Sequence, residues 1–186
     1  MLALCPPLGH APLVLALAGL PGAGKSSLAG LLAAAARWSV LDRDQIRAQR
    51  HPGDSSDAAR ADADEVLLRR VGSGVRASLN VIVDGKTWAR AADRHALQEA
   101  VDDAGGDLQW CWLEVPIELA KARVRSTAAH PAPDRDDDLV SRVAARFEAL
   151  ADCAWRLDAS QSPEQLLQQI LLRLAIRLNA ILIDDK

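Results

Sequence analysis

The 186-residue chain lacks several residues on which protein chemistry often depends. It has no tyrosine, which excludes a phenolic acid, base or nucleophile, and it has only one phenylalanine. Its three cysteines, Cys5, Cys111 and Cys153, are odd in number and far apart, and its four histidines are equally scattered. This spacing argues against both a disulfide framework and a zinc site.

The sequence also shows no export signal and no membrane anchor. Residues 1–20 are largely apolar, but no Lys or Arg precedes them, and Pro6, Pro7 and Pro12 interrupt them. No apolar run is long enough to cross a bilayer. We therefore expect a cytoplasmic protein without a membrane partner.

Neither sign of charge dominates the chain. Lys and Arg number 22 and Asp and Glu 25, so the net charge is -3. This balance excludes a broad basic surface that coats nucleic acid but allows a local basic groove. Hydrophobic residues make up 49% of the chain, which is enough for a core. We expect a single domain over residues 1–186.

Apolar runs and helical patterns alternate along the chain. Strands are expected at 13–18, 39–41, 80–83, 108–115 and 155–157. Helices are expected at 25–36, 45–49, 57–79, 91–104, 116–127, 138–151 and from 163 to about 178. The first strand is apolar throughout, which is typical of a central parallel strand covered on both faces. The order predicts an α/β fold with helices on both faces of a parallel sheet.

The turn after the first strand carries the strongest motif. Residues 19–26, Gly-Leu-Pro-Gly-Ala-Gly-Lys-Ser, match the phosphate-loop pattern, with a strand before and a helix after. Backbone N–H groups of such a loop wrap around phosphates, Lys25 reaches the β- and γ-phosphates, and the Ser26 hydroxyl binds Mg²⁺. The sequence therefore predicts ATP and Mg²⁺ as cofactors. The predicted nucleotide-binding residues are Gly19, Gly22, Ala23, Gly24, Lys25, Ser26 and Ser27.

Several classes of phosphate-loop protein do not fit the remaining sequence. Guanine recognition needs an Asn-Lys-x-Asp segment, and neither Asn80 nor Asn179 begins one. A Ser-Gly-Gly transporter signature is absent, and the chain is too short for a ring ATPase. A small phosphotransferase remains.

Three segments together resemble a known family. Residues 19–27, residues 40–47 (Val-Leu-Asp-Arg-Asp-Gln-Ile-Arg) and residues 81–84 (Val-Ile-Val-Asp) are similar to the small P-loop kinases. That group includes polynucleotide 5′-hydroxyl kinases, gluconate kinases, chloramphenicol phosphotransferase and zeta-toxin-like kinases. The resemblance covers roughly residues 13–178. It implies a three-layer P-loop NTPase fold with a five-stranded parallel sheet in the order 2-3-1-4-5, and a small helical lid at about 117–138.

The resemblance also implies roles for carboxylates at the ends of two strands. In the family, the carboxylate that activates the acceptor follows the second strand, commonly three residues before an Arg, and Asp44 and Arg47 have that spacing. Asp42 is the alternative base, and Asp44 is alternatively a helix N-cap. All three residues are expected at the acceptor. Asp84 ends the third strand and is expected to hold Mg²⁺ together with Ser26.

Further basic residues complete the expected site. Lys86 follows the third strand in the crevice where ligands bind in open sheets, and Arg94 matches an Arg of the family's next helix. Arg123 matches the first Arg of the family's lid and is expected to contact the nucleotide and to act in catalysis, while Thr127 stands where a second Arg is usual. Trp88 is either a wall of the acceptor pocket or part of the core.

We therefore expect an ATP-dependent kinase acting on a hydroxyl of a small metabolite, such as a sugar acid, a nucleoside or an antibiotic. Gluconate is one candidate. Two alternatives stay open: a polynucleotide 5′-hydroxyl kinase and a non-kinase ATP-binding switch. A nucleic-acid groove would draw on Arg43, Arg47, Arg50, Arg69 and Arg70. The protein is expected to be a monomer or a homodimer, the latter because residues 176–183 are apolar.

Overall fold

The computed structural model describes residues 11–126, 136–149 and 154–184, with side chains described as far as 177 in the last range. The five strands are β1 (Leu13–Gly19), β2 (Ser39–Asp42), β3 (Val81–Asp84), β4 (Asp107–Glu114) and β5 (Trp155–Asp158). The helices are α1 (Lys25–Ala36), α2 (Arg43–Arg50), α3 (Asp57–Arg76), α4 (Ala91–Asp102), α5 (Ile117–Ser126), α6 (Asp137–Ala145) and α7 (Pro163–Asp184).

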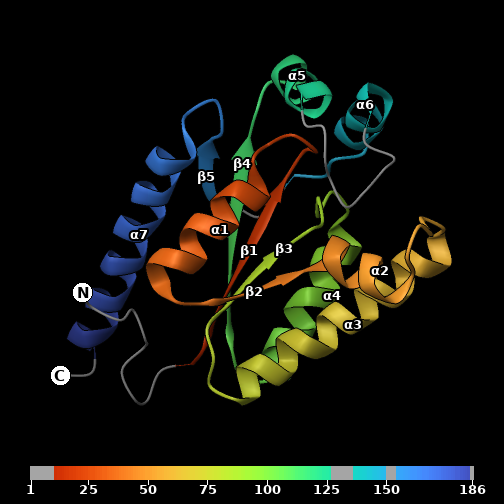
Figure 1. The fold of residues 1–186 in the computed structure, drawn as a ribbon. Helices are drawn as coiled ribbons and strands as arrows, with labels where there is room; N and C mark the ends of the chain where they lie inside the picture. The colour runs from red at the N-terminus through yellow and green to blue at the C-terminus, as the bar shows by residue number, and fades with distance from the viewer. Residues whose placement is uncertain (1–10, 127–135, 150–153, 185–186) are drawn as a thin grey trace.

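The sheet has the topology that the resemblance implies. Its strand order is β2-β3-β1-β4-β5, and every neighbouring pair is parallel. Figure 1 shows α1 and α7 on one face of the sheet and α3 and α4 on the other. The expected three-layer α/β fold is confirmed, and the carboxyl ends of β1, β2 and β3 meet at one edge, where open sheets bind ligands.

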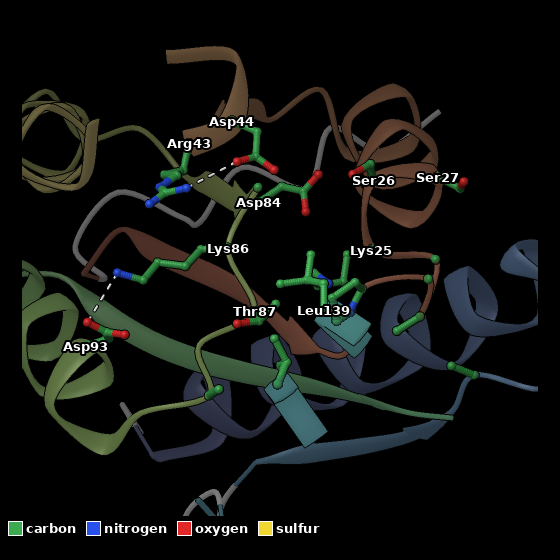
Figure 2. A pocket seen from close by; sticks show the side chains of 18 of the residues that line it. Lys25, Ser26, Ser27, Arg43, Asp44, Asp84, Lys86, Thr87, Asp93 and Leu139 are labelled. Atoms are coloured by element: carbon green, nitrogen blue, oxygen red, sulfur yellow. Dashed lines mark hydrogen bonds and ion pairs between the residues drawn. The ribbon is translucent and has the colours of Figure 1, made fainter. Parts of the chain in front are cut away.

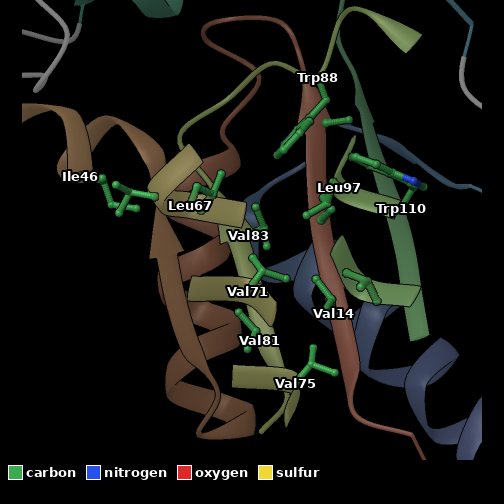
Figure 3. Packing of buried hydrophobic residues seen from close by; sticks show 14 of the residues in the cluster. Val14, Ile46, Leu67, Val71, Val75, Val81, Val83, Trp88, Leu97 and Trp110 are labelled. Atoms are coloured by element: carbon green, nitrogen blue, oxygen red, sulfur yellow. The ribbon is translucent and has the colours of Figure 1, made fainter. Parts of the chain in front are cut away.

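Strand β1 divides the core into two halves. Alternate residues, Val14, Ala16 and Ala18, pack with α3 and α4, as Figure 3 shows for Val14. Residues of the other parity, among them Leu15 and Leu17, pack with α1 and α7. All seven residues of β1 are buried, so its continuous apolarity has the expected cause.

Helix α3 contains two glycines in its middle, one of which lies in tight contact with β3. The helix runs unbroken through Gly72 and Gly74. A Cβ on Gly74 would lie 3.0 Å from Val81 Cγ2, and one on Gly72 would lie 3.2 Å from the Arg76 guanidinium. Gly74 therefore allows α3 to lie close to β3, whereas the Arg76 side chain near Gly72 belongs to α3 itself.

Trp88 belongs to the core. It is 1% exposed, and its ring meets Trp110 edge to face with centroids 5.4 Å apart, as Figure 3 illustrates. Of the two expectations for this residue, the core one is correct.

The region expected to form the lid, about 117–138, contains α5, and α6 begins at its end, at Asp137. Ala120 and Val124 of α5 pack against Val140 of α6, and Leu20 of the phosphate loop packs on this cluster. An ion pair between Arg125 and Asp137 also joins the two helices. Residues 127–135 of the expected lid, Thr127 included, lie outside the described residues. No helix among the described residues is both long enough and apolar enough to cross a membrane.

Candidate active site

The phosphate loop connects β1 to α1 and needs its glycines. Gly22 has φ +83°, and a Cβ there would lie 2.3 Å from the carbonyl oxygen of Ala120 in α5. Gly19 meets the Leu113 carbonyl of β4 in the same way, at 2.7 Å. Only glycine fits such approaches, so the loop's shape follows from its sequence.

The start of α1 is available for an anion. Its N-cap, Gly24, has no side chain, so no side chain caps the first N–H groups of the helix. The Lys25 ammonium donates hydrogen bonds to the carbonyl oxygens of Gly19 (3.0 Å) and Leu20 (2.9 Å), which holds it inside the loop. These groups have the arrangement that the motif predicts for a phosphate-binding loop, and phosphate binding itself stays a prediction.

A cavity of about 800 Å³ opens from this loop. Its walls come from the phosphate loop, α2, α3, the segment after β3, α5, α6 and the segment after β5. Of the predicted site residues, those lining it include Gly22, Ala23, Gly24, Lys25, Ser26, Ser27, Asp44, Arg47, Asp84, Lys86 and Arg123. Most of the predicted site residues therefore line one cavity.

Asp42 and Asp44 have separate tasks. The Asp42 carboxylate accepts hydrogen bonds from the backbone N–H groups of Asp44 (2.8 Å) and Gln45 (3.1 Å), so Asp42 is the N-cap of α2. Asp42 does not line the cavity, whereas Asp44 does. The expectation that Asp42 binds the acceptor does not fit this geometry, because the helix start occupies its carboxylate. The alternative that Asp44 is the cap is wrong.

Burial shapes the acidity of Asp44. Loss of solvent raises its pKa above the usual value, and the charges of Arg43, Arg47 and Lys25 oppose that rise without cancelling it. Arg43 Nη1 lies 3.3 Å from one carboxylate oxygen and so orients the group. A carboxylate with a raised pKa is a stronger base, which suits proton removal from a hydroxyl.

Asp84 is a buried carboxylate with one oxygen that lacks a hydrogen-bond partner among the described residues. It is 1% exposed, and that oxygen is Oδ1. Figure 2 shows its side chain between Asp44 and Ser26, facing the cavity. An unpaired buried charge is costly, so this site fits the expected Mg²⁺. The described residues contain no group of three or more His, Cys, Asp or Glu that could hold a metal.

Gly85 brings the two acidic positions together. It has φ +80°, and a Cβ there would lie 2.3 Å from Asp42 Oδ1 and 2.6 Å from the backbone nitrogen of Asp44. Because glycine has no Cβ, the end of β3 can lie directly against the start of α2. This contact sets Asp84 beside the capped turn that presents Asp44.

Arg47 is a buried cation without an ion pair among the described residues. It is 3% exposed, and Nη1 donates a 2.7 Å hydrogen bond to the carbonyl oxygen of Asp54. Its Nε has no partner in the described part of the chain. Asp44 is near enough to interact with this charge but does not pair with it directly, so this side of the cavity suits an anionic group that can.

The other two basic residues predicted to bind substrate, Lys86 and Arg94, make their contacts with groups of the protein. Lys86 lines the cavity but forms ion pairs with Asp64 (2.7 Å) and Asp93 (3.3 Å). Arg94 does not line the cavity. Its guanidinium donates to the backbone carbonyl oxygens of Trp88, Ala89 and Ala149, at 2.7, 3.2 and 2.8 Å. The expectation that Arg94 binds substrate does not fit this geometry, because its guanidinium instead connects two loops by hydrogen bonds.

Arg123 lies where the resemblance places it. It lines the cavity, and its Nη1 donates a 2.8 Å hydrogen bond to the carbonyl oxygen of Ala159, just after β5. This contact joins the lid helix α5 to the segment that follows β5.

The sequence analysis missed one wall of the cavity. Four residues of α3 line it, at spacings of three and four that define one helix face: Asp57, Arg60, Ala61 and Asp64. Arg43, which the analysis placed only in a possible nucleic-acid groove, joins this wall through an ion pair with Asp64 at 2.8 Å. The i, i+3, i+4, i+7 spacing of these four residues is the sequence signal that predicts a shared helix face.

Comparisons with known proteins identify a family and several similar proteins. A protein-family model described as "AAA domain" matches residues 14–152. The shikimate kinase of Nostoc sp. (strain PCC 7120) is 27% identical over 167 residues, which is 83% of this chain and 87% of that protein.

Two solved structures share the fold. A gluconokinase from Sinorhizobium meliloti 1021 has a TM-score of 0.68 at 19% identity, over 95% of this chain and 99% of that one. The Mycobacterium tuberculosis APS kinase, in complex with AMPPNP and APS, has a TM-score of 0.67 at 20% identity, over 89% and 98%. Because the family match spans well over half of the chain, the protein belongs to this AAA-domain family of P-loop proteins, as a small P-loop kinase, a class that uses ATP.

Proposed function

We propose that the protein transfers the γ-phosphate of ATP to a hydroxyl of a small anionic acceptor, with Asp44 as the general base. The observation that carries this proposal is that Asp44, a partly buried carboxylate not used as a helix cap, shares one cavity with Lys25 of the phosphate loop. A nucleotide-binding switch has no need of a basic carboxylate there.

The residues divide the reaction among them. Asp44 takes the acceptor's hydroxyl proton as the hydroxyl oxygen bonds to the γ-phosphorus and the bond to the β,γ-bridging oxygen breaks, which releases ADP. Lys25 stabilises the charge on the β- and γ-phosphates, and Arg123 holds the lid helix over the nucleotide. Ser26 and Asp84 would hold Mg²⁺, which when bound neutralises phosphate charge.

The buried Arg47 supports an acid as the acceptor. Arg47 lines the same cavity as Asp44 and acts on its charge from a distance, but no described residue forms an ion pair with Arg47, so its positive charge lacks an opposite charge in direct contact. A carboxylate or phosphate on the acceptor would supply that charge and turn a hydroxyl toward Asp44. Relatives named for shikimate and gluconate, which are both hydroxy acids, are in line with this proposal.

The polynucleotide alternative has weaker support. Three of the five arginines proposed for a nucleic-acid groove form ion pairs with acidic side chains, at 2.6 to 2.8 Å: Arg43 with Asp64, Arg50 with Asp62, and Arg69 with Glu65. These pairs neutralise the charge that a phosphate backbone would need.

Kinetics of an Arg47→Gln variant test the acceptor class. We expect KM for a hydroxy acid substrate to rise at least about tenfold, while KM for its neutral amide stays within about twofold of wild type. An equal rise in both KM values would contradict the assignment. Lysine at this position keeps the charge and is expected to restore part of the difference.

A further inference from the structure

Asp64, on the cavity-facing side of α3, lies between two cations. Its Oδ1 accepts a hydrogen bond from Arg43 Nε at 2.8 Å, and its Oδ2 accepts one from Lys86 Nζ at 2.7 Å. Arg43 comes from the start of α2 and Lys86 from the segment after β3. One carboxylate therefore links three separate elements of the cavity wall.

Each of the three nitrogen atoms of the Arg43 guanidinium makes a contact. While Nε binds Asp64, Nη1 lies 3.3 Å from Asp44 Oδ1, and Nη2 lies 3.4 Å from the carbonyl oxygen of Arg60. Arg43 is 12% exposed, so it has little room to turn. Asp44 consequently receives a single long hydrogen bond rather than the two-pronged pairing that arginine prefers with carboxylates.

This arrangement matters for a base. A two-pronged pair would engage both oxygens of Asp44 and would favour its charged form, which weakens its pull on a proton. With Arg43 turned toward Asp64, one oxygen of Asp44 stays available to a hydroxyl. Figure 2 shows Arg43 meeting Asp44 at one edge only.

We propose that Asp64 is a positioning residue for Asp44, acting through Arg43. Asp64 draws the guanidinium away from Asp44 and anchors it to α3 and Lys86. Without Asp64, Arg43 collapses onto Asp44 and occupies the oxygen that the acceptor hydroxyl needs. This inference rests on the proposed function, in which Asp44 is the base.

A double-mutant cycle tests the inference in the full-length protein. Asp64→Asn keeps the side-chain shape and is expected to lower kcat roughly 10- to 100-fold, with KM for ATP within about twofold of wild type. In an Arg43→Gln background the same change is expected to lower kcat by less than about threefold, because the group that collapses is gone. Equal losses in both backgrounds, or no loss in either, would overturn the inference.

A matched control is Asp62→Asn on the same helix. Asp62 also contacts two basic side chains, Arg50 and His51, but it does not line the cavity. Its loss is expected to leave kcat unchanged. If Asp64→Asn and Asp62→Asn lower both Tm and kcat alike, Asp64 is merely structural and the inference fails.

A second measurement does not depend on turnover. The Asp44 carboxyl can be titrated by carbon NMR in wild type and in Asp64→Asn, and its pKa is expected to fall in the variant. The other charged groups near Asp44, namely Arg47, Lys25, Asp42 and Asp84, are unchanged by the substitution. An unchanged pKa would overturn the inference. A wild-type protein that transfers no phosphate, yet shows the shift, would reject the proposed function and not this positioning.

Discussion

The carboxylate of Asp42 accepts a 2.8 Å hydrogen bond from the backbone N–H of Asp44, two residues later in the chain. This bond explains why two neighbouring aspartates differ in role. A carboxylate that caps a helix is held by N–H donors, whereas one in the first turn points outward and stays available. The cap therefore both fixes the start of α2 and presents Asp44 to the cavity.

The first prediction separates these two roles by substitution. Asp44→Asn is expected to lower kcat about 10² to 10⁴-fold, because the base is lost while the shape is kept. ATP binding, measured by calorimetry, is expected to persist. Asp42→Asn is the matched control, since Asn caps helices about as well as Asp and kcat should stay within about threefold of wild type. A greater loss in Asp42→Asn than in Asp44→Asn would reverse the assignment.

The second prediction concerns pH. Burial raises the pKa of Asp44 above 3.8, and the base works only when deprotonated. The rate constant kcat/KM should therefore fall as the pH drops through this raised pKa, in a limb that lies above pH 3.8. In Asp44→Asn the residual rate should lack that limb. A wild-type acid limb centred below 3.8, measured where the protein stays folded, would contradict the assignment.

The same raised pKa has a consequence for stability. The folded state holds the Asp44 proton more tightly than the unfolded state, so folding stability falls as the pH rises through the window between the two pKa values. At neutral pH the charged carboxylate is then a net cost to the fold. Asp44→Asn should accordingly show no fall in Tm at neutral pH, and its Tm relative to wild type should decline as the pH is lowered into that window. Thermal unfolding followed by circular dichroism measures this.

The third prediction concerns Asp84. Asp84→Asn removes a buried charge with an unpartnered oxygen, so Tm without Mg²⁺ is expected to rise. The apparent affinity for Mg²⁺ in the presence of ATP is expected to fall roughly tenfold or more. Magnesium titrations followed by thermal shift provide both values. A variant whose Mg²⁺ response equals that of wild type would exclude Asp84 as a ligand.

The fourth prediction concerns the contact between β3 and α2. In Gly85→Ala the new Cβ would lie 2.3 Å from Asp42 Oδ1, so α2 must shift and Asp44 with it. We expect kcat to fall by roughly 10²-fold. Gly53→Ala is the control, since Gly53 also has positive φ (+76°) but no atom within 4 Å of an added Cβ. The Gly53→Ala variant should lose about 1 kcal/mol of the free energy of unfolding and keep the kcat of wild type. Equal effects on kcat would show that backbone strain alone is responsible.

The sheet and the phosphate loop were predictable from the sequence because their signals are local. A continuous apolar run, a glycine-rich turn and a helix lie within residues 13–36, and each reports its own conformation. The strand order came from the resemblance, and the structure confirms it. The single-domain extent over residues 1–186 stays a prediction.

The parts that sequence could not supply depend on contacts between distant segments. The sequence places the start of the second helix at residue 45, but it begins at Arg43, and this shift of two residues moves the cap from Asp44 to Asp42. Arg94 fits a family pattern, yet only the fold shows that carbonyl groups of two loops surround it. The role of Asp64 appears only once α3 packs beside α2 and the end of β3.

Phosphate transfer from γ-labelled ATP to a panel of acceptors tests the central claim most directly. The panel contains small hydroxy acids, their neutral amides and a 5′-hydroxyl oligonucleotide, each with wild type and Asp44→Asn. The account predicts that wild type labels at least one hydroxy acid, in clear preference to its amide and to the oligonucleotide, and that Asp44→Asn loses this labelling while it still binds ATP. Labelling of the oligonucleotide alone, or of no acceptor at all by a protein that binds ATP, would contradict the account.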